Sequence, residues 1–432
     1  MQMSVALLKK RRFLPLFATQ FSGAFNDNLF RTAMIMLVIY GIYQDEAQEA
    51  SFSAIAGGLF ILPFFLLSAL AGQLADASDK ARIIRWVKTA EILIMVGGAA
   101  GLLLHNIPLL LAALCAMGVH STFFGPIKYA ILPQHLKPDE VLGGTGLVEA
   151  GTYIGILGGT ILGGLLVMRD ADGGYHATWA AAGVLLVAII GRITGGYVPP
   201  ACPEPGAPPA RIDWHIVRAS WTLVNGTMHI PRLFLAILCI SFFWAQGAIL
   251  AAQFPPLVKN VLGADQGVAT LFLSIFSVGV AVGSVLINRL LAGRVLAVYS
   301  PAAAIVMGLF VLHLYWNASH WPRPTAELLS LAAFLAVDGA WWVMLDLFGV
   351  AVAGGMFVVP LYAFLTTTVA KSETARTVAA NNIVNSGAMV LSALLLAGLI
   401  QLGVSVAGTL LLVAVASPVA AWIAWRLHLA CD

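Results

Sequence analysis

Asp27 and Arg31 stand four residues apart inside one long apolar run of the sequence, on one face of the helix that such a run predicts. Lys128 and Glu149 stand inside two later runs. A charge at the centre of a bilayer costs at least about 2.5 kcal/mol, so each of these groups is a candidate for function. A cation binds phosphate and a carboxylate binds an ammonium group. The mixed signs therefore predict a site for a zwitterionic or phosphate-bearing headgroup.

The same charges also have structural explanations. Asp27 and Arg31 could satisfy one another as a structural pair. Lys128 could extend its ammonium group to the cytoplasmic interface. A further buried acid, Glu91, could pair with Lys88 three residues earlier. The sequence leaves these alternatives open, and the C-terminal half offers amides in place of charges.

The elements that hold these residues follow from composition. The chain has 432 residues, of which 60% are hydrophobic and only 10% are charged. A soluble domain carries about 25% charged residues, and a membrane-spanning helix needs about 20 apolar ones. Twelve apolar runs lie at 13–40, 53–74, 83–104, 107–130, 141–167, 178–198, 232–257, 267–290, 296–316, 342–366, 377–400 and 404–427. We predict an all-α membrane protein with twelve transmembrane helices and no large soluble domain.

A Pro-rich stretch over residues 199–209 separates the first six runs from the last six. Such a stretch cannot continue a helix and acts as a semi-rigid linker. We predict an N-terminal bundle over 1–198, a cytoplasmic linker over 199–230 and a C-terminal bundle over 231–432. Lys and Arg gather at the chain ends, in the linker and in alternate loops, which places both termini in the cytoplasm.

Residues 321–341 are apolar but fit no span, because the part after Pro324 is too short to cross a bilayer. We predict an interfacial helix on the outer face, anchored by Trp residues. The four cysteines form no CxxC pair, which gives no indication of a zinc site. We expect neither a metal nor a cofactor, and structural roles for three histidines that lack matching ligand partners: His105, His120 and His313.

The two halves resemble each other weakly. Residues 124–130 and 358–363 both carry a Pro followed closely by a Tyr, then a basic loop and a run that begins with polar residues. Repeated halves place a substrate site at their interface near the membrane midplane, and rocking of the halves gives alternating access. The sequence therefore predicts two pseudo-symmetric six-helix bundles that work as a transporter.

The loop after the second run resembles the signature loop of the major facilitator superfamily. Gly72, Asp76, Lys80 and Arg82 match that signature, and Asp79 replaces its second Gly. The resemblance implies the major facilitator fold of two six-helix bundles. It also implies a conformational latch in which Asp76 pairs with Lys80, Arg82 or a helix N-terminus. Gly72 would let two helices approach closely.

The fifth run carries glycines at every fourth residue, which gives a smooth helix face for tight packing. The run also resembles an antiporter pattern of the superfamily, with Thr160 where that pattern has Pro. Packing alone is an equally good explanation. The predicted packing residues are Gly151, Gly155, Gly159 and Gly163.

Several segments together resemble the bacterial lysophospholipid transporter family within the superfamily. They are residues 20–28, 72–76, 126–132, 146–150, 242–244 and 357–361, spread from the first run to the eleventh. Enteric members of that family have an Arg in span 7 after a Phe-Trp pair. Here residues 247–253 hold no cation, so Arg31 is the candidate to take over that phosphate contact.

The resemblance implies transport of lysophospholipids, such as lysophosphatidylethanolamine, from the outer to the inner leaflet of the bacterial inner membrane. A cytoplasmic acyltransferase or acyl-ACP synthetase would then re-acylate them. We expect a monomer that binds no nucleic acid. The expected substrate-binding residues are Asp27, Asn28, Arg31, Lys128, Tyr129, Glu149, Tyr153, Gln246, Tyr362, Asn382 and Asn385.

Two other classes of function remain. A proton-coupled exporter of drugs or small metabolites would explain the glycine pattern and the buried acids Asp27, Glu91 and Glu149. A membrane acyltransferase would need an H-x4-D motif, and the nearest approach is residues 135–140 on a short loop. We therefore expect a transporter and not an enzyme.

Overall fold

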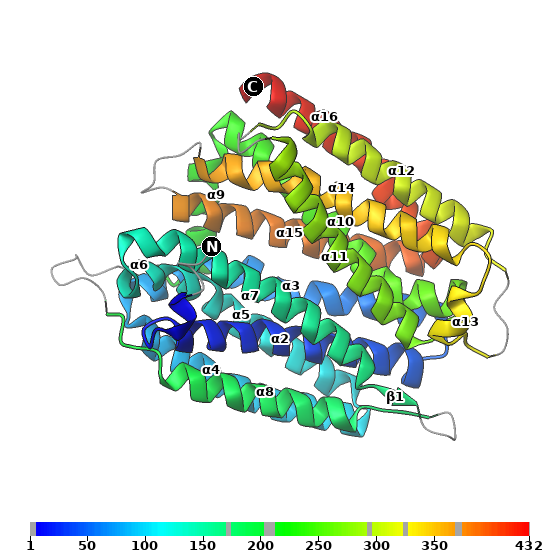
Figure 1. Ribbon diagram of the computed structural model, residues 1–432, viewed down its shortest axis with the longest axis horizontal. Coiled ribbons are helices and arrows are strands. Elements are labelled where there is room, and N and C mark those ends of the chain that lie inside the picture. The colour runs from blue at the N-terminus through cyan, green and yellow to red at the C-terminus, as the bar shows by residue number, and fades with distance from the viewer. Residues whose placement is uncertain are drawn as a thin grey trace. The chain divides into compact units, whose positions relative to one another are not determined.

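The computed structural model describes residues 6–169, 174–202, 212–291, 296–322, 327–367 and 374–431. Figure 1 shows a chain built almost entirely of long helices. The first six are α2 (Leu14–Met36), α3 (Glu46–Ala77), α4 (Lys80–Leu104), α5 (Ile107–Ala130), α7 (Pro138–Leu165) and α8 (Thr178–Gly196). The last six are α10 (Pro231–Pro256), α11 (Gln266–Leu290), α12 (Ser300–Ser319), α14 (Ala340–Thr367), α15 (Thr374–Gln401) and α16 (Val406–Cys431).

Short elements connect the long helices. They are η1 (Ala6–Lys9), α6 (Leu132–His135), α9 (Ile216–Met228), α13 (Leu331–Leu335) and the hairpin strands β1 (Met168–Arg169) and β2 (Tyr175–His176). Two π-helical segments, η2 (Leu37–Ile42) and η3 (Leu257–Val261), continue α2 and α10 directly. They lie at the ends of the first and the seventh long helix. The two halves thus share a feature that their sequences do not reveal.

Ten of the described helices are long and apolar enough to cross a membrane by length and composition. The helices α2 and α7, with 23 and 28 residues, are not among these ten; of α7, the described part Ile154–Leu165 is a shorter apolar helix. At 1.5 Å per residue, both are long enough to cross about 30 Å of hydrocarbon. Together they complete the predicted set of twelve. Polar residues lower the hydropathy of α2, and those are the residues that the sequence marks as functional.

The chain divides into two compact units. Unit 1 holds Met1–Gly41 and Leu66–Ala219, and unit 2 holds Ile42–Phe65 and Ser220–Asp432. The first part of α3 therefore groups with unit 2 and its last part with unit 1. The bundle boundaries at 198 and 231 stay a prediction. Of the predicted linker, residues 203–211 lie outside the described residues, and α9 forms its later part.

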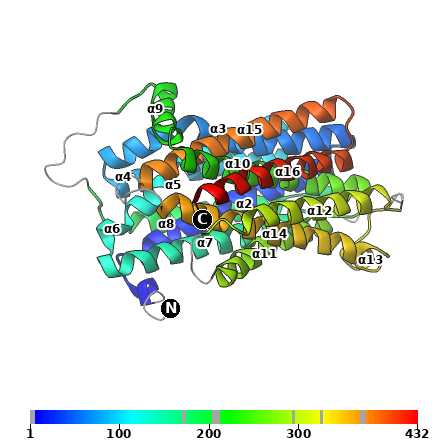
Figure 2. The same ribbon diagram turned by 90° about the horizontal axis from the view of Figure 1, so that it is seen from above.

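In unit 1, α2 packs along α7, and the same pair can be followed in Figure 2. An added Cβ at Gly155 would lie 3.1 Å from the carbonyl oxygen of Phe21, and one at Gly163 would lie 2.6 Å from that of Leu29. Added Cβ atoms at Gly151 and Gly159 would collide with the Phe17 ring and the Phe25 carbonyl. The four-residue glycine stripe thus meets a four-residue stripe on α2, as in other small-residue helix contacts.

In unit 2, α11 packs on α14 by the same device. A Cβ at Gly283 would collide with the Val352 carbonyl, and one at Gly355 would collide with that of Val280. These backbones touch directly. Sequence analysis did not single out this pair, although Gly279 and Gly283 have the same four-residue spacing as the stripe on α7.

The predicted interfacial helix over 321–341 is short in the structure. Only Leu331–Leu335 is helical, and residues 323–326 lie outside the described part. Trp321 donates through Nε1 to the Leu262 carbonyl at 3.1 Å, and its ring stacks on that of Phe334. Phe334 is fully buried. Trp321 and Phe334 therefore attach this segment to the connection before α11, whereas Trp341 at its end is exposed.

Glu49 on the first turn of α3 is completely buried in unit 2. Its two carboxylate oxygens accept from Lys259 Nζ at 2.5 Å and from Asn260 Nδ2 at 2.7 Å, both on η3. Sequence analysis singled out neither residue, because they lie 210 positions apart. The structure makes them one buried ion pair.

We expect Lys259→Met to lower the free energy of unfolding by about 3–5 kcal/mol, because it leaves the Glu49 carboxylate buried without its cation. Thermal unfolding of the purified protein measures this. The double variant Glu49→Gln/Lys259→Met should recover much of the loss. Arg218→Met, which breaks an exposed pair with Asp213, is the matched control and should melt like wild type. A wild-type melting temperature for Lys259→Met would contradict the prediction.

Candidate functional site

Asp27 lies near the middle of α2 in unit 1. Its Oδ2 accepts a hydrogen bond from the Ser121 hydroxyl on α5, and its buried Oδ1 has no hydrogen-bond partner among the described residues. Arg31, one turn later, is close enough for a charge interaction with Asp27. The structure therefore gives Asp27 a partner on another helix and one carboxylate oxygen that is still able to accept.

A second buried cluster lies beside Asp27 and centres on Glu91 of α4. Glu91 Oε2 accepts from Lys88 Nζ at 2.6 Å, and Oε1 accepts from Asn26 Nδ2 at 3.0 Å. His120 Nε2 lies 3.4 Å from Oε2, at the long end for a hydrogen bond and within the range of an ion pair. The sequence did not predict this contact, because α5 brings the His120 ring against a carboxylate that is distant in sequence.

Lys88 is fully buried, and two glycines make room for it. An added Cβ at Gly23 would lie 2.8 Å from Lys88 Nζ, and one at Gly191 would lie 3.5 Å from it. The ammonium group also lies 5.1 Å from the centre of the Phe124 ring. Glu91 and Lys88 form a buried ion pair in which their charges neutralise each other. The pairing that the sequence offered as a structural explanation for Glu91 is therefore present.

Lys128 lies on the last turn of α5, facing α7. Its Nζ is 3.4 Å from Thr152 Oγ1, and Thr152 donates to Gln20 Oε1 at 2.9 Å. These polar groups connect α5, α7 and α2 within unit 1. The side chains of three other predicted site residues lie outside the described part of the structure: Tyr129, Glu149 and Tyr153.

Unit 2 presents uncharged polar groups. The Tyr362 hydroxyl on α14 accepts from Trp244 Nε1 at 2.7 Å and lies 3.4 Å from Asn385 Nδ2. Ser241 donates to Asn385 Oδ1 at 2.8 Å. Trp244 and Ser241 were missed as site residues, although Trp244 belongs to the Phe-Trp pair that carries part of the resemblance. The structure thus joins α10, α14 and α15 through one neutral network.

Two predicted residues of unit 2 lie outside this network. Gln246 is buried and its Nε2 faces α16, 3.4 Å from the Val413 carbonyl and from Ser417 Oγ. Asn382 is exposed and accepts from Asn381 at 3.5 Å. The donor of Gln246 faces α16, while its buried Oε1 has no hydrogen-bond partner among the described residues, and its substrate role stays a prediction.

Asp79, which replaces the second Gly of the signature loop, caps α4. It accepts from the backbone N–H groups of Ala81 at 3.1 Å and Ala201 at 2.8 Å. Such a cap satisfies donors that a helix N-terminus leaves free, which explains an Asp at this position. An added Cβ at Gly72 would meet none of the described residues within 4 Å, and the close helix approach expected there stays a prediction.

The predicted latch is described only in part. Lys80 is buried and Arg82 is exposed, while the Asp76 side chain lies outside the described residues. A different charge cluster lies at the start of α7, where Lys10 and Arg12 both bind Glu140, at 2.5 and 2.6 Å. The hydrogen bond from Lys10 lowers the pKa of Glu140 to about 2, with help from the Lys137 backbone N–H. These N-terminal cations therefore bind the start of α7.

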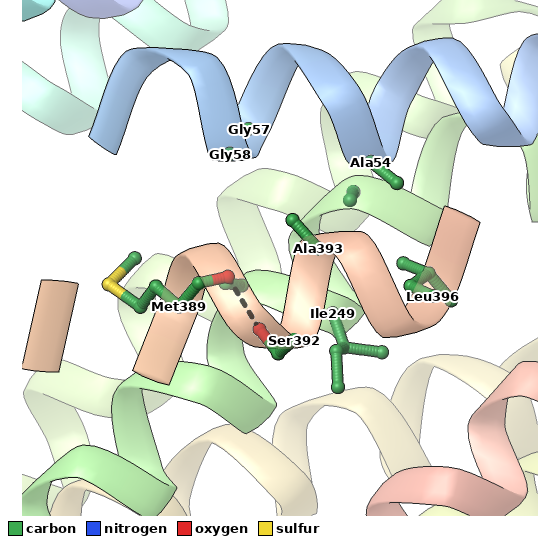
Figure 3. Close-up of a pocket in the computed structure, with 10 residues that line it drawn as sticks. Ala54, Gly57, Gly58, Ile249, Met389, Ser392, Ala393 and Leu396 are labelled. Carbon is green, nitrogen blue, oxygen red and sulfur yellow. Dashed lines mark hydrogen bonds between the residues drawn. The ribbon is translucent and has the colours of Figure 1, made fainter. Parts of the chain in front are cut away.

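A small, mainly apolar pocket lies in unit 2, with a cavity volume of only about 10 Å³. Figure 3 shows that its labelled side chains come from the first part of α3 and from α10 and α15. Its one hydroxyl, that of Ser392, donates to the Met389 carbonyl at 2.8 Å. Because that hydroxyl is satisfied in its own helix, the pocket suits hydrocarbon and not a charged group.

The fold and the polar groups on its spans are those of a membrane transporter. The family model of the Major Facilitator Superfamily matches residues 16–393. The chain belongs to this superfamily and is a multi-pass membrane protein.

The similar curated proteins are more specific. Lysophospholipid transporter LplT of Pectobacterium carotovorum subsp. carotovorum is 27% identical over 398 residues, which cover 90% of this chain and 86% of that protein. The protein of the same name from Shigella flexneri serotype 5b is 28% identical over 90% of this chain and 87% of its own length.

Solved transporters share the fold. A bacterial homologue of the human lysosomal transporter Spinster, in an inward-facing and unoccupied conformation, superposes with a TM-score of 0.67 at 14% identity and covers 98% of both chains. A D-xylose–proton symporter gives a TM-score of 0.70 at 11% identity, over 96% of this chain and 97% of the symporter. At such identities the likeness concerns the fold alone.

Proposed function

We propose that this chain is a lysophospholipid transporter. The observation that carries the proposal is the set of charged groups on the spans of unit 1: a carboxylate at Asp27, with cations at Arg31 and Lys128. A headgroup with an ammonium and a phosphate needs both signs. The lysophospholipid transporters that resemble the chain over 90% of its length support the same substrate class.

We assign the ammonium group to Asp27, whose Oδ1 is still able to accept a hydrogen bond. We assign the phosphate to Arg31 and Lys128. The middle of α10 carries no cation between Ser241 and Pro256, so unit 2 offers no charge there for this role. Its contribution would be the neutral network around Tyr362.

The free-energy cost of removing the acyl chain from lipid indicates the route that the substrate takes. Removing a 16-carbon chain from lipid costs on the order of 13 kcal/mol, at about 0.8 kcal/mol per CH₂. We therefore propose a lateral opening that lets the tail stay in hydrocarbon while the headgroup crosses. The direction would be from the outer to the inner leaflet of the bacterial inner membrane, where a cytoplasmic acyltransferase or acyl-ACP synthetase re-acylates the product. We propose a monomer, organised in bundles over 1–198 and 231–432, with both termini in the cytoplasm.

Thermal unfolding in nanodiscs tests the substrate class. A ligand at 100 times its dissociation constant stabilises the folded state by about 2.7 kcal/mol. We expect lysophosphatidylethanolamine to raise the melting temperature, and a two-chain phosphatidylethanolamine and free phosphoethanolamine to leave it unchanged. Stabilisation by a lipophilic cation and none by the lysophospholipid would contradict the proposal and favour a drug exporter.

A further inference from the structure

His120 stands in the middle of a chain of polar contacts that no substrate role explains. Its Nδ1 lies 3.3 Å from Ser121 Oγ, and Ser121 in turn donates to Asp27 Oδ2. On the other side of the ring, Nε2 lies 3.4 Å from Glu91 Oε2. Only 5% of His120 and 1% of Glu91 are exposed. The contacts thus run from Asp27 through a hydroxyl and an imidazole to the Glu91–Lys88 pair.

The Ser121 hydroxyl has only one hydrogen to donate. This limits where the other hydrogens in this row of contacts can lie. When the Ser121 hydroxyl donates to Asp27, the 3.3 Å contact requires a hydrogen on His120 Nδ1. Nε2 makes no hydrogen bond among the described residues, and at 3.4 Å from Glu91 Oε2 it is the ring position where a further proton would face a carboxylate. When Nε2 carries that further proton, His120 is an imidazolium ion beside the Asp27 carboxylate.

A second arrangement uses the same atoms and the same number of protons. The Nδ1 proton of His120 passes to Ser121 Oγ while the Ser121 hydroxyl proton passes to Asp27 Oδ2. Positive imidazolium and negative carboxylate become neutral imidazole and neutral carboxylic acid. No bond between heavy atoms changes and no co-reactant is needed, so the step is a proton transfer balanced within the three residues.

The charged groups around His120 determine the net charge of the cluster before and after it binds one proton. The charged and titratable groups that face the chain are Asp27 and Arg31 on α2, and Lys88 and Glu91 on α4. On α5, Lys128 faces Thr152, and on α8, Arg192 bonds to the exposed Thr89. Counting the described groups around His120, the cluster is neutral without the extra proton and carries one positive charge with it.

We propose that His120, Ser121 and Asp27 form a proton-binding relay that controls the charge of Asp27. With the proton on His120, the Asp27 carboxylate can hold an ammonium group. With the proton passed to Asp27, that attraction is lost and the ligand is released. The ammonium ligand rests on the proposed function, whereas proton binding by the three residues does not.

Infrared difference spectra of the purified full-length chain, without any lipid substrate, test proton binding directly. We expect acidification to produce a carboxylic-acid band that Asp27→Asn removes. Ser121→Ala, which cuts the relay, should remove or shift the band, and Ser121→Thr, which keeps a hydroxyl, should preserve it. A spectrum without an Asp27 acid band at any pH would overturn the relay, whatever the protein transports.

The pH profile of lysophospholipid binding tests the coupling. One coupled proton changes apparent affinity by up to about tenfold per pH unit, so we expect affinity to rise with pH over the range in which the relay loses its proton. His120→Gln should flatten this profile, and Ser121→Thr should restore the shape that Ser121→Ala loses. The control is His105→Asn at an exposed position. His105 has a left-handed backbone conformation, which Asn also adopts readily, so this variant should keep the wild-type profile. A wild-type profile in His120→Gln would overturn the coupling.

Discussion

Asp27→Asn is expected to reduce lysophospholipid transport by about 10- to 100-fold, because hydrogen bonds to charged groups contribute about 1.5–3 kcal/mol and this substitution removes the charge. Asn has the size of Asp, and its amide oxygen can still accept from Ser121. Lys128→Ala should cause a comparable loss, because it removes a cation assigned to the phosphate. Initial rates in proteoliposomes with matched protein content measure both effects.

The control for Asp27→Asn is Asp213→Asn, which removes an exposed carboxylate beside α9. It should transport at the wild-type rate. Equal expression and equal elution volume on size exclusion establish that the Asp27 and Lys128 variants are folded. Normal transport in both variants would mean that the charges of unit 1 are structural, and the site assignment would fail.

The second large effect concerns packing. Gly159→Ala and Gly283→Ala are each expected to lower the free energy of unfolding by about 1–3 kcal/mol, as overpacking of a close contact does. In both cases the new methyl group would collide with a backbone carbonyl, of Phe25 and of Val352. A backbone cannot turn aside as a side chain can, so neighbouring helices must separate.

Thermal unfolding of the purified variants measures this loss. Gly398→Ala on α15 is the matched control, because an added Cβ there meets nothing within 4 Å. Alanine is a better helix former than glycine by about 1 kcal/mol, so this variant should melt at or above the wild-type temperature. Melting temperatures that rise in all three variants would show that helix propensity outweighs contact at Gly159 and Gly283.

The sequence predicted the helices well, because the bilayer makes hydropathy a strong signal. It also predicted the glycine stripe from Gly151 to Gly163, since a four-residue period is a local property. The π-helical turns η2 and η3 were not predictable, because the same apolar sequence is compatible with an α-helix and with a π-helix. Their physical cause is a change of hydrogen-bond register, not of composition.

The candidate site was predictable only in part. Asp27 stood out because a lone acid in an apolar run is costly wherever the helix packs. His120 and Ser121 did not stand out, because their importance comes from α5 lying against α2 and α4. Lys259 and Glu49 are 210 residues apart, so their ion pair has no local signature. Contacts of this kind follow from the packing of helices that are distant in sequence.

The buried charged groups of unit 1 have two different roles. Lys88 and Glu91 neutralise each other in a cradle of glycines, and a buried pair of this kind fixes how its helices pack more than it adds stability. Asp27 keeps an unused acceptor oxygen and a hydroxyl link to His120. It is therefore the acid that remains available for a ligand and for a proton.

The central claim is that this chain moves lysophospholipids across a bilayer. Its most direct test places labelled lysophosphatidylethanolamine in the outer leaflet of proteoliposomes and follows its protection from extraction by albumin. The account predicts rapid protection in vesicles with the wild-type chain, slow protection with Asp27→Asn, and none above background for a labelled two-chain phospholipid. Protection no faster than in protein-free vesicles would contradict it.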